Sequence, residues 1–404
     1  MFGLLELALA SSLAAVGFAL PSVGAEAVGA GSTHISTALP VPRTAQSPSD
    51  SSGSAPGTGP LSGYMELHLN HPTDGTPAPA VLDFHRFVLL FSHGFSDRLR
   101  FVGELEVEHA VVEGLEEGGE LAIEQAYLDF LIHPTLNIRA GMLLVPVGII
   151  NERHEPPVFH GVERPFVDTF IVPTTWFEAG AGIHGAFGRG FRYRAYAMAP
   201  LDATEFSAEA GLQGAAQHGS EAVVRNAAVT GRLEYVGMRG LQTGVSFWTG
   251  DTGFNVPRIK TSVGLYEFDG RFSRGRIEAR GQLAHVFIRG AGALNDAMGR
   301  LTGIDPNIAE QLFGAYGEVA FRFLPSSSPH DAAVFVRYEN FDTQYKMPAG
   351  SLPLPQFDRD AWVAGATYWV DPDVAIKFDY SYVRSKSEIV PPPRSFNVGL
   401  GWWF

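Results

Sequence analysis

The densest group of residues that could do chemistry lies in segment 145–176, VPVGIINERHEPPVFHGVERPFVDTFIVPTTW. Its ionisable side chains include Glu152, Arg153, His154, Glu155, Glu163, Arg164 and Asp168. Carboxylates and guanidinium groups that face each other across a water-filled passage create a transverse field, which screens solutes by size and charge. The chemistry suggested here is selection of small solutes rather than bond making.

Arginines elsewhere in the chain could form the opposite wall of such a passage. They are Arg100, Arg139, Arg192, Arg194 and Arg232. We expect the charged residues of segment 145–176 to meet this arginine ladder. The alternative is that Arg153 and Arg164 pair with carboxylates of the segment itself and only hold it in place, because ion pairs are common without a transport role.

Other chemistry finds little support in this sequence. His154-Glu155 and His160 do not have the HExxH spacing, and the intervening Pro-Pro pair excludes a helix, so we expect a histidine–carboxylate hydrogen bond and no metal. No GxSxG motif is present, and GAGAL at 290–294, expected in an outer loop, lacks the lysine of a phosphate-binding loop. We predict no cofactor, no catalytic residue and no enzymatic activity.

The elements that must position these residues alternate apolar and polar side chains with period two, as β-strands do. Their lengths cluster near the roughly 9–11 residues with which a tilted strand crosses a bilayer. We predict about sixteen strands, near 63–70, 81–92, 98–110, 121–132, 136–144, 177–187, 191–199, 225–236, 241–250, 259–272, 275–288, 312–323, 332–340, 360–370, 373–384 and 394–404.

The connections between these strands also alternate, because those after even-numbered strands are short and those after odd-numbered strands are mostly longer. Outer-membrane barrels have short periplasmic turns and long outer loops. We therefore predict an all-β fold, a closed antiparallel transmembrane β-barrel of about sixteen strands. Segment 145–176 is its third outer loop, and its length of roughly thirty residues predicts that it folds into the lumen and narrows it.

The two faces of the predicted strands differ in chemistry. Val374, Ile376 and Phe378 share one face of their strand, and Lys377 and Asp379 share the other. A charge that is buried without a partner costs several kcal/mol. We therefore expect the apolar face to contact lipid and the charged face to line a wet lumen.

The last strand, RSFNVGLGWWF, places Phe396, Val398, Leu400, Trp402 and Phe404 on one face. An exposed aromatic edge of this kind invites aggregation in a soluble sandwich, which is the ordinary alternative. The ending resembles the C-terminal strand of bacterial outer-membrane barrels, where a terminal Phe is part of the assembly signal. The resemblance implies recognition by the barrel-assembly machinery.

The composition of the 404 residues excludes several classes of protein. The chain has no cysteine, so it has no disulfides and no thiolate chemistry. Its formal charge of -14 argues against a nucleic-acid partner. Charged residues make up only 18%, whereas the mean hydropathy of +0.04 is too low for a helical membrane protein, and a barrel accounts for both values.

The chain divides into three parts. Residues 1–25 read as a secretory signal peptide, although Glu6 interrupts the apolar run and no Lys or Arg precedes it; an uncut membrane anchor is the alternative. Residues 26–60 are a disordered Gly/Ser/Pro-rich linker, and 61–404 form the barrel. We expect export through the periplasm to the outer membrane of a Gram-negative bacterium.

Four strings, IRAGMLLVPVG, NERHEPP, VERP and IVPTTWFEAGAGIHG, resemble the phosphate-selective porin O and P family. The resemblance implies a sixteen-stranded, trimeric outer-membrane porin. Members that select phosphate have funnels rich in lysine and arginine, but this chain has only four lysines, Lys260, Lys346, Lys377 and Lys386. We therefore expect no phosphate selectivity.

The sequence thus predicts an outer-membrane porin, a homotrimer surrounded by lipid and lipopolysaccharide, that passes small hydrophilic solutes or ions by passive diffusion. Two other classes stay open. One is an outer-membrane barrel enzyme of lipase or protease type, and scattered Ser, His and acidic residues do not exclude it. The other is a structural or adhesive barrel whose outer loops are contact surfaces.

Overall fold

The computed structural model describes residues 61–75, 77–110, 119–256 and 259–404. The predicted signal peptide at 1–25 and the predicted linker at 26–60 lie outside the described residues. Among the described residues, no helix combines the length and the apolar character needed to cross a membrane.

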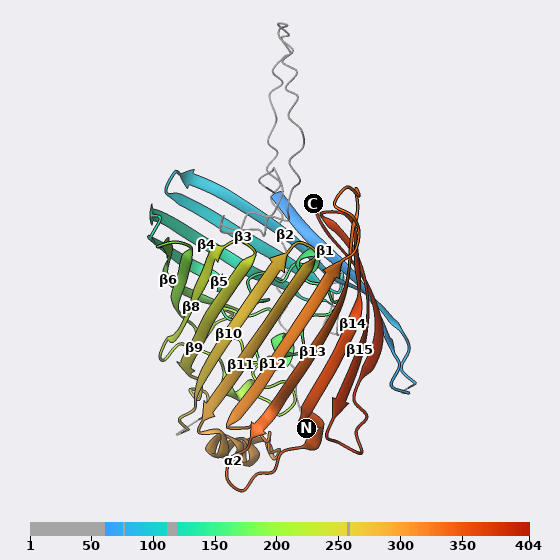
Figure 1. Ribbon diagram of the computed structural model, residues 1–404. Coiled ribbons are helices and arrows are strands. Elements are labelled where there is room, and N and C mark those ends of the chain that lie inside the picture. The colour runs from blue at the N-terminus through green and yellow to red at the C-terminus, as the bar shows by residue number, and fades with distance from the viewer. Residues whose placement is uncertain (1–60, 76, 111–118, 257–258) are drawn as a thin grey trace, which may run out of the picture. The chain divides into compact units, whose positions relative to one another are not determined.

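Sixteen β-strands make up the fold, and each pairs antiparallel with its neighbours in the chain (Figure 1). β1 also pairs with β16, for example through Leu67 opposite Leu400, so the sheet closes into a barrel. The strands are β1 Leu61–Pro72, β2 Val81–Ser96, β3 Leu99–Glu108, β4 Leu121–His133, β5 Leu136–Leu144, β6 Phe177–Phe187, β7 Phe191–Met198, β8 Ala228–Met238, β9 Leu241–Asp251, β10 Ser262–Arg274, β11 Ile277–Arg289, β12 Gln311–Arg322, β13 Asp331–Lys346, β14 Asp358–Asp371, β15 Val374–Ser385 and β16 Arg394–Trp403.

The predicted fold class, strand number and strand order are confirmed, and the predicted alternation of short and long connections is present. The predicted faces are also found. On β15, Phe378 and Tyr380 are exposed on the outside, whereas Lys377 and Asp379 are buried inside. Phe396 and Phe404 are exposed at the C-terminal strand. Period-two alternation was sufficient to find these faces because successive side chains of a strand point to opposite sides of the sheet.

Short helices occur only in the outer connections of the described chain. They are η1 Pro156–Val158, α1 Val167–Phe170, η2 Ala203–Glu205, α2 Ala291–Thr302 and η3 Pro355–Phe357. The GAGAL string lies in the connection between β11 and β12, where residues 291–294 form the first turn of α2. Gly290 precedes α2 with φ of 81°, and Ala291, Leu294 and Ala297 bury one face of the helix. This three-residue spacing is the signal of an amphipathic helix.

The expectation of a wet inner face is wrong where segment 145–176 lies. One buried apolar cluster joins Val145, Ile150, Val167, Ile171 and Trp176 of the segment to inner residues of the wall. The wall residues of this cluster include Tyr127, Trp248, Leu265 and Phe341. The reason is that the segment is rich in apolar side chains between its charges, and these cover the inner face that the strand pattern leaves open.

Candidate solute passage

The long connection between β5 and β6, which we call loop L3 (145–176), is closed at its neck. The backbone N–H of Val145 donates to the carbonyl of Trp176 at 2.9 Å. The side-chain amide of Asn151 donates to both the Val145 and the Trp176 carbonyls at 2.8 Å, and its oxygen accepts from the N–H of Trp176 at 2.7 Å. Asn151 is fully buried, so this pinch fixes where the loop leaves the wall.

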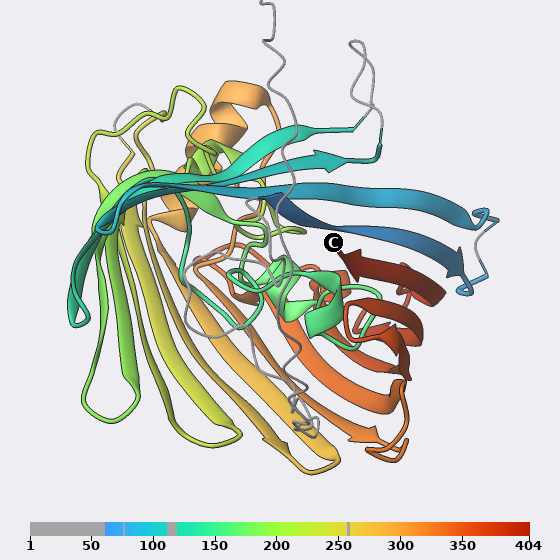
Figure 2. The same cartoon turned by 90° about the horizontal axis from the view of Figure 1, so that it is seen from above.

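Beyond its neck, L3 contacts strands far from β5 in the closed sheet. The N–H of Ile149 donates to Gln282 Oε1 of β11 at 2.9 Å, that of Val167 to Glu339 Oε2 of β13 at 3.0 Å, and that of Val162 to Asp379 Oδ2 of β15 at 2.6 Å. β13 lies opposite β5 in the strand order. L3 therefore reaches across the inside of the barrel, as the green segment in Figure 2 shows.

Two buried cations on the far wall complete these contacts. Arg337 Nε lies 2.7 Å from Glu339 Oε1, and its Nη1 lies 3.2 Å from Glu318 Oε2. Lys377 Nζ donates to the carbonyl of Gly161 at 2.8 Å and lies 3.7 Å from the centre of the Phe159 ring. Each of these two buried cations therefore has an opposite charge, a carbonyl or an aromatic ring beside it. The far wall can contact L3 without burying an unpaired charge.

Only part of the predicted pairing between L3 and the arginine ladder is present. Glu152 Oε1 lies 3.1 Å from Arg194 Nε, so this loop acid does meet the ladder. Arg153 instead donates to Gln242 Oε1 at 2.9 Å and lies 3.7 Å from Glu234. Arg164 donates to Thr175 Oγ1 at 3.0 Å, a contact inside L3 itself.

The remaining loop acids contact uncharged or imidazole groups. Glu163 Oε1 lies 3.0 Å from His68 Nδ1 and accepts from the Asn70 amide at 2.9 Å. Burial alone would raise the pKa of Glu163, but these two partners lower it to about 2. Glu155 is half-buried at the start of η1, and its Oε2 has no hydrogen-bond partner.

The other ladder arginines are matched by carboxylates of the wall. Arg100 Nη2 lies 2.7 Å and Arg139 Nη2 lies 3.3 Å from the same Asp129 Oδ2. Arg232 Nη1 lies 2.6 Å from Asp269 Oδ2. Arg192 is opposite Glu234 in the register of β7 and β8. The wall therefore presents nearly balanced charge rather than a bare positive ladder.

Two cavities flank L3 on opposite sides of the barrel. One, of about 10 Å³ and so about the size that a single water molecule needs, lies against β8, β9 and β10. It is lined by Gly148, Ile149, Glu152, Arg153, Arg232, Glu234, Gln242 and Arg271. The other, of about 110 Å³, lies against β13 to β16 and is lined by Glu163, Arg164, Phe166, Arg337, Val363, Asp379, Ser381, Val383, Pro393, Ser395 and Asn397. Both cavities present carboxylates and guanidinium groups together, a chemistry suited to small polar or charged solutes.

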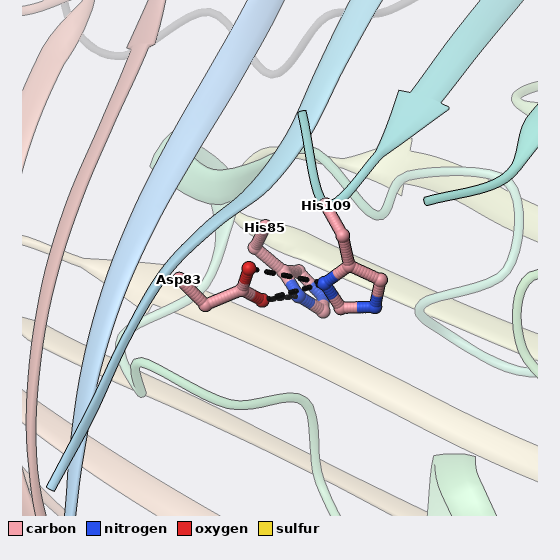
Figure 3. A group of neighbouring side chains, drawn as sticks. All are labelled: Asp83, His85 and His109. Atoms are coloured by element: carbon pink, nitrogen blue, oxygen red, sulfur yellow. Dashed lines mark hydrogen bonds and ion pairs between the residues drawn. The ribbon is translucent and has the colours of Figure 1, made fainter. Parts of the chain in front are cut away.

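Two groups of side chains in the described residues have the donor atoms of a metal site. Asp83 and His85 of β2 lie beside His109, which follows β3 (Figure 3). The second group, Glu104 of β3, Glu124 of β4 and His154 of L3, is buried. The expected histidine–carboxylate hydrogen bond is made by His160, whose Nε2 lies 3.0 Å from Glu278 Oε2. His154 Nδ1 instead lies 3.0 Å from the backbone carbonyl of Asn151, and its Nε2 lies 3.3 Å from Glu124 Oε2.

Sequence reasoning placed Asp379 on the inner face but did not foresee that Gln282, Glu339 and Asp379 bind L3. It missed Glu124. The register of β3 and β4 shifts between Glu104 and Leu105, a β-bulge that leaves Glu124 as an extra residue. Its buried side chain therefore breaks the alternation, and no local pattern predicts it.

Asp168 gives L3 a dependence on pH. It is fully buried in α1, accepts from Gln282 Nε2 at 2.8 Å, and leaves Oδ2 without a hydrogen-bond partner. Burial raises the pKa of its carboxyl from 3.8 to about 7. Between these values the folded chain holds a proton that the unfolded chain has lost, so stability falls as the pH rises and levels off above pH about 7.

We therefore expect Asp168→Asn to stabilise the protein at pH 8 but not at pH 4. Each pKa unit is worth about 1.4 kcal/mol, so the gain at pH 8 is at most about 4 kcal/mol. Thermal unfolding in detergent at both pH values measures it, with Asp251→Asn, at an exposed residue, as the control. Parallel pH profiles for the wild type and Asp168→Asn would contradict this assignment.

The sequence and the fold were compared with those of known proteins. No family model matches the chain. It is 36% identical over 353 residues to an uncharacterized protein of Aquifex aeolicus strain VF5, across 85% of this chain and 79% of that protein. The fold, at 8–12% identity and over 85% of this chain, is that of solved outer-membrane proteins.

Three of these structures are informative. The outer membrane channel DcaP of Acinetobacter baumannii matches with a TM-score of 0.56, 11% identity and 96% of its chain covered. An anion-selective porin from Comamonas acidovorans matches with 0.53, 12% and 98%. The trimer form of OmpT, an outer membrane protein of Vibrio cholerae, matches with 0.50, 9% and 98%. At this identity the likeness shows a shared fold.

Proposed function

We propose that this chain, which belongs to one family with the Aquifex aeolicus protein, is an outer-membrane porin that passes small hydrophilic solutes or ions by passive diffusion. The observation that carries the proposal is a closed barrel with an apolar outer face, crossed inside by a loop with charged cavities beside it. The fold shared with an anion-selective porin and an outer membrane channel supports it.

On this proposal, L3 narrows the passage. Solutes pass along the edges of L3 and not along the barrel axis. The buried apolar cluster joins L3 to the inner face of the wall. Glu152, Arg153 and Arg194 keep part of their side chains exposed beside the cavity against β8 to β10. Since the arginines have carboxylates near them, we infer weak charge preference and no phosphate selectivity.

The finer features follow from the same proposal. We infer a location in the bacterial outer membrane after export through the periplasm, contact with lipid and lipopolysaccharide, and assembly through β16. Trimerisation is supported by the resemblance to the phosphate-selective porin O and P family and by the trimer form of the Vibrio cholerae protein. Membership of that porin family is part of the proposal as well.

Liposome swelling tests the proposal directly. Purified protein is reconstituted and mixed with isosmotic solutions of sugars of increasing size. We expect swelling for small sugars that stops at a sharp size limit, because L3 leaves only narrow cavities. An absence of swelling by folded, heat-modifiable protein would reject the porin and favour a barrel enzyme or a structural barrel.

Arg153→Gln is expected to shift ion preference. Arg153 lines a cavity beside two other arginines, Arg232 and Arg271, so its loss removes positive charge from the path and moves the reversal potential toward cation selectivity. The measurement is the reversal potential of single channels in a salt gradient. Arg239→Gln, in an exposed turn between β8 and β9, is the matched control and leaves the potential unchanged.

Arg164→Gln distinguishes the two roles that the sequence leaves open for the L3 arginines, which are lining the solute passage and holding the loop in place. Arg164 also lines a cavity but donates to Thr175 of L3, so its neutralisation tests anchoring as well as charge. An unchanged ion preference in the Arg153→Gln and Arg164→Gln double variant would defeat the assignment of L3 to the passage.

A further inference from the structure

We propose that His154, Glu104 and Glu124 form a binding site for a divalent transition-metal ion of the zinc class, which fastens L3 to the barrel wall. His154 comes from L3, Glu104 from β3 and Glu124 from β4. His154 Nε2 lies 3.3 Å from Glu124 Oε2 and 4.0 Å from Glu104 Oε1. All three side chains are at most 3% exposed.

The imidazole is already oriented as a metal ligand. Its Nδ1 lies 3.0 Å from the carbonyl oxygen of Asn151, an atom that can only accept, so Nδ1 carries a proton and Nε2 presents a lone pair when the imidazole is neutral. Metal-binding histidines are usually fixed in this way by a second partner. Nε2 is buried and has no hydrogen-bond partner.

The carboxylates show the same arrangement. Glu104 Oε2 accepts from the amide of Gln125, which turns Oε1 toward His154. Glu124 Oε2 is buried, points at Nε2 and has no hydrogen-bond partner. An outer partner is therefore present for two of the three groups, and their inner atoms converge on one point.

The balance of charge also favours a cation at this point. Glu104 and Glu124 bring two buried carboxylates together. Arg86, the wall guanidinium nearby, is already 2.7 Å from Glu66 and 3.3 Å from Glu106. A divalent ion held by all three groups balances both carboxylates in their ionised form, whereas burying them ionised without a matching charge costs several kcal/mol.

The donor set selects the class of metal. Imidazole nitrogen with carboxylate oxygen suits zinc and its neighbours, whereas Mg²⁺ and Ca²⁺ prefer all-oxygen sites. With metal–ligand distances of roughly 2.0–2.2 Å, the donors of a tetrahedral site lie about 3.3–3.5 Å apart. The 3.3 Å contact already fits this, and a small shift of Glu104 brings the 4.0 Å contact into range.

The group in Figure 3 is a weaker candidate and serves as the internal control. Asp83 accepts from His85 Nδ1 at 3.1 Å and from His109 Nδ1 at 2.9 Å, so the donors already satisfy one another. His109 is about half exposed. Nothing in this group requires an ion.

The test is metal loading of the folded, full-length protein. The protein is treated with chelator, loaded with Zn²⁺, and passed through a desalting column before its zinc content is measured. We expect about one Zn²⁺ per chain for the wild type and the His85→Gln/His109→Gln variant, and under about 0.2 for His154→Gln and Glu124→Gln. Gln125→Met, which removes an outer partner, should weaken affinity about 10- to 100-fold.

Folding is checked by the shift between heated and unheated samples on a detergent gel. If His154→Gln does not fold, the visible spectrum of Co²⁺-loaded wild type decides instead, since a four-coordinate site absorbs strongly and a six-coordinate one weakly. Zinc below about 0.2 per chain in wild type, or zinc lost only in His85→Gln/His109→Gln, overturns the proposal. The metal-loading test needs no flux measurement, so its outcome does not depend on the proposed porin function.

Discussion

Excision of L3 is expected to raise single-channel conductance at least about threefold, because sixteen strands enclose an aqueous channel wherever no segment fills it. The neck makes a clean excision possible. Val145 and Trp176 are hydrogen-bonded to each other, directly after the paired Leu144 and Phe177. A four-residue Gly/Ser turn in place of 146–175 therefore closes the β5–β6 hairpin without moving either strand.

The expected rise has a direct physical cause. The excised residues include Ile150, Val167 and Ile171, which belong to the buried apolar cluster between L3 and the inner wall, and their removal replaces these side chains with water. The same excision should remove the sharp size limit in liposome swelling. Planar-bilayer recordings in one salt solution measure the conductance of both proteins.

A matched control shortens a different outer connection. Removing 387–390 between β15 and β16 deletes Ile389, which is 92% exposed, and should leave conductance unchanged. If the L3 excision gives heat-modifiable barrels with wild-type conductance, L3 does not limit the passage, and the porin proposal loses its constriction.

The barrel itself was predictable because its physics is local. Each strand has an exposed outer side and a buried inner side, so alternation along residues such as Phe378, Lys377 and Tyr380 reports the face directly. The lengths of the connections then give topology, since sequential antiparallel strands need only turns. Even the loop that matters was evident from its length.

The partners of the charged residues were not predictable, because they depend on register. Arg100 and Arg139 were expected to face L3, but both lie opposite Asp129 across neighbouring strands. A one-residue shift in register would undo this match. Bulges such as the one at Glu124 cause shifts of this kind, and sequence alternation does not reveal them.

The dry interior was missed for a related reason. The strand pattern shows that an inner face differs from a lipid face, but not what covers it. Tyr127 and Trp248 lie on the inner face and pack against L3. Their cover is set by a segment that was interpreted through its charges, although VPVGII and FIVP at its two ends are apolar.

Arg337→Met is expected to destabilise the folded barrel by about 3–5 kcal/mol, the cost of breaking a buried ion pair by removing one partner. Arg337 is 1% exposed and lies between Glu318 and Glu339. Glu318 keeps a second cation, because Arg280 Nε lies 2.8 Å away. Glu339 loses its guanidinium partner and keeps only the N–H of Val167, which donates to its Oε2.

The size of the effect therefore depends on the charge of Glu339 rather than on the lost volume. The double variant Arg337→Met/Glu339→Gln removes the orphaned charge and leaves an acceptor for Val167, so most of the stability should return. Denaturant unfolding in detergent, followed by the fluorescence of buried Trp176 and Trp248, measures all variants.

Arg384→Met is the matched control, since Arg384 pairs with Asp360 at 2.8 Å on the surface and such exposed pairs contribute little to stability. If Arg337→Met loses no more stability than Arg384→Met, water is not excluded from the charged side chains of the far wall. Water would then reach Glu339 beneath L3, and the solute path would run under the loop rather than along its edges.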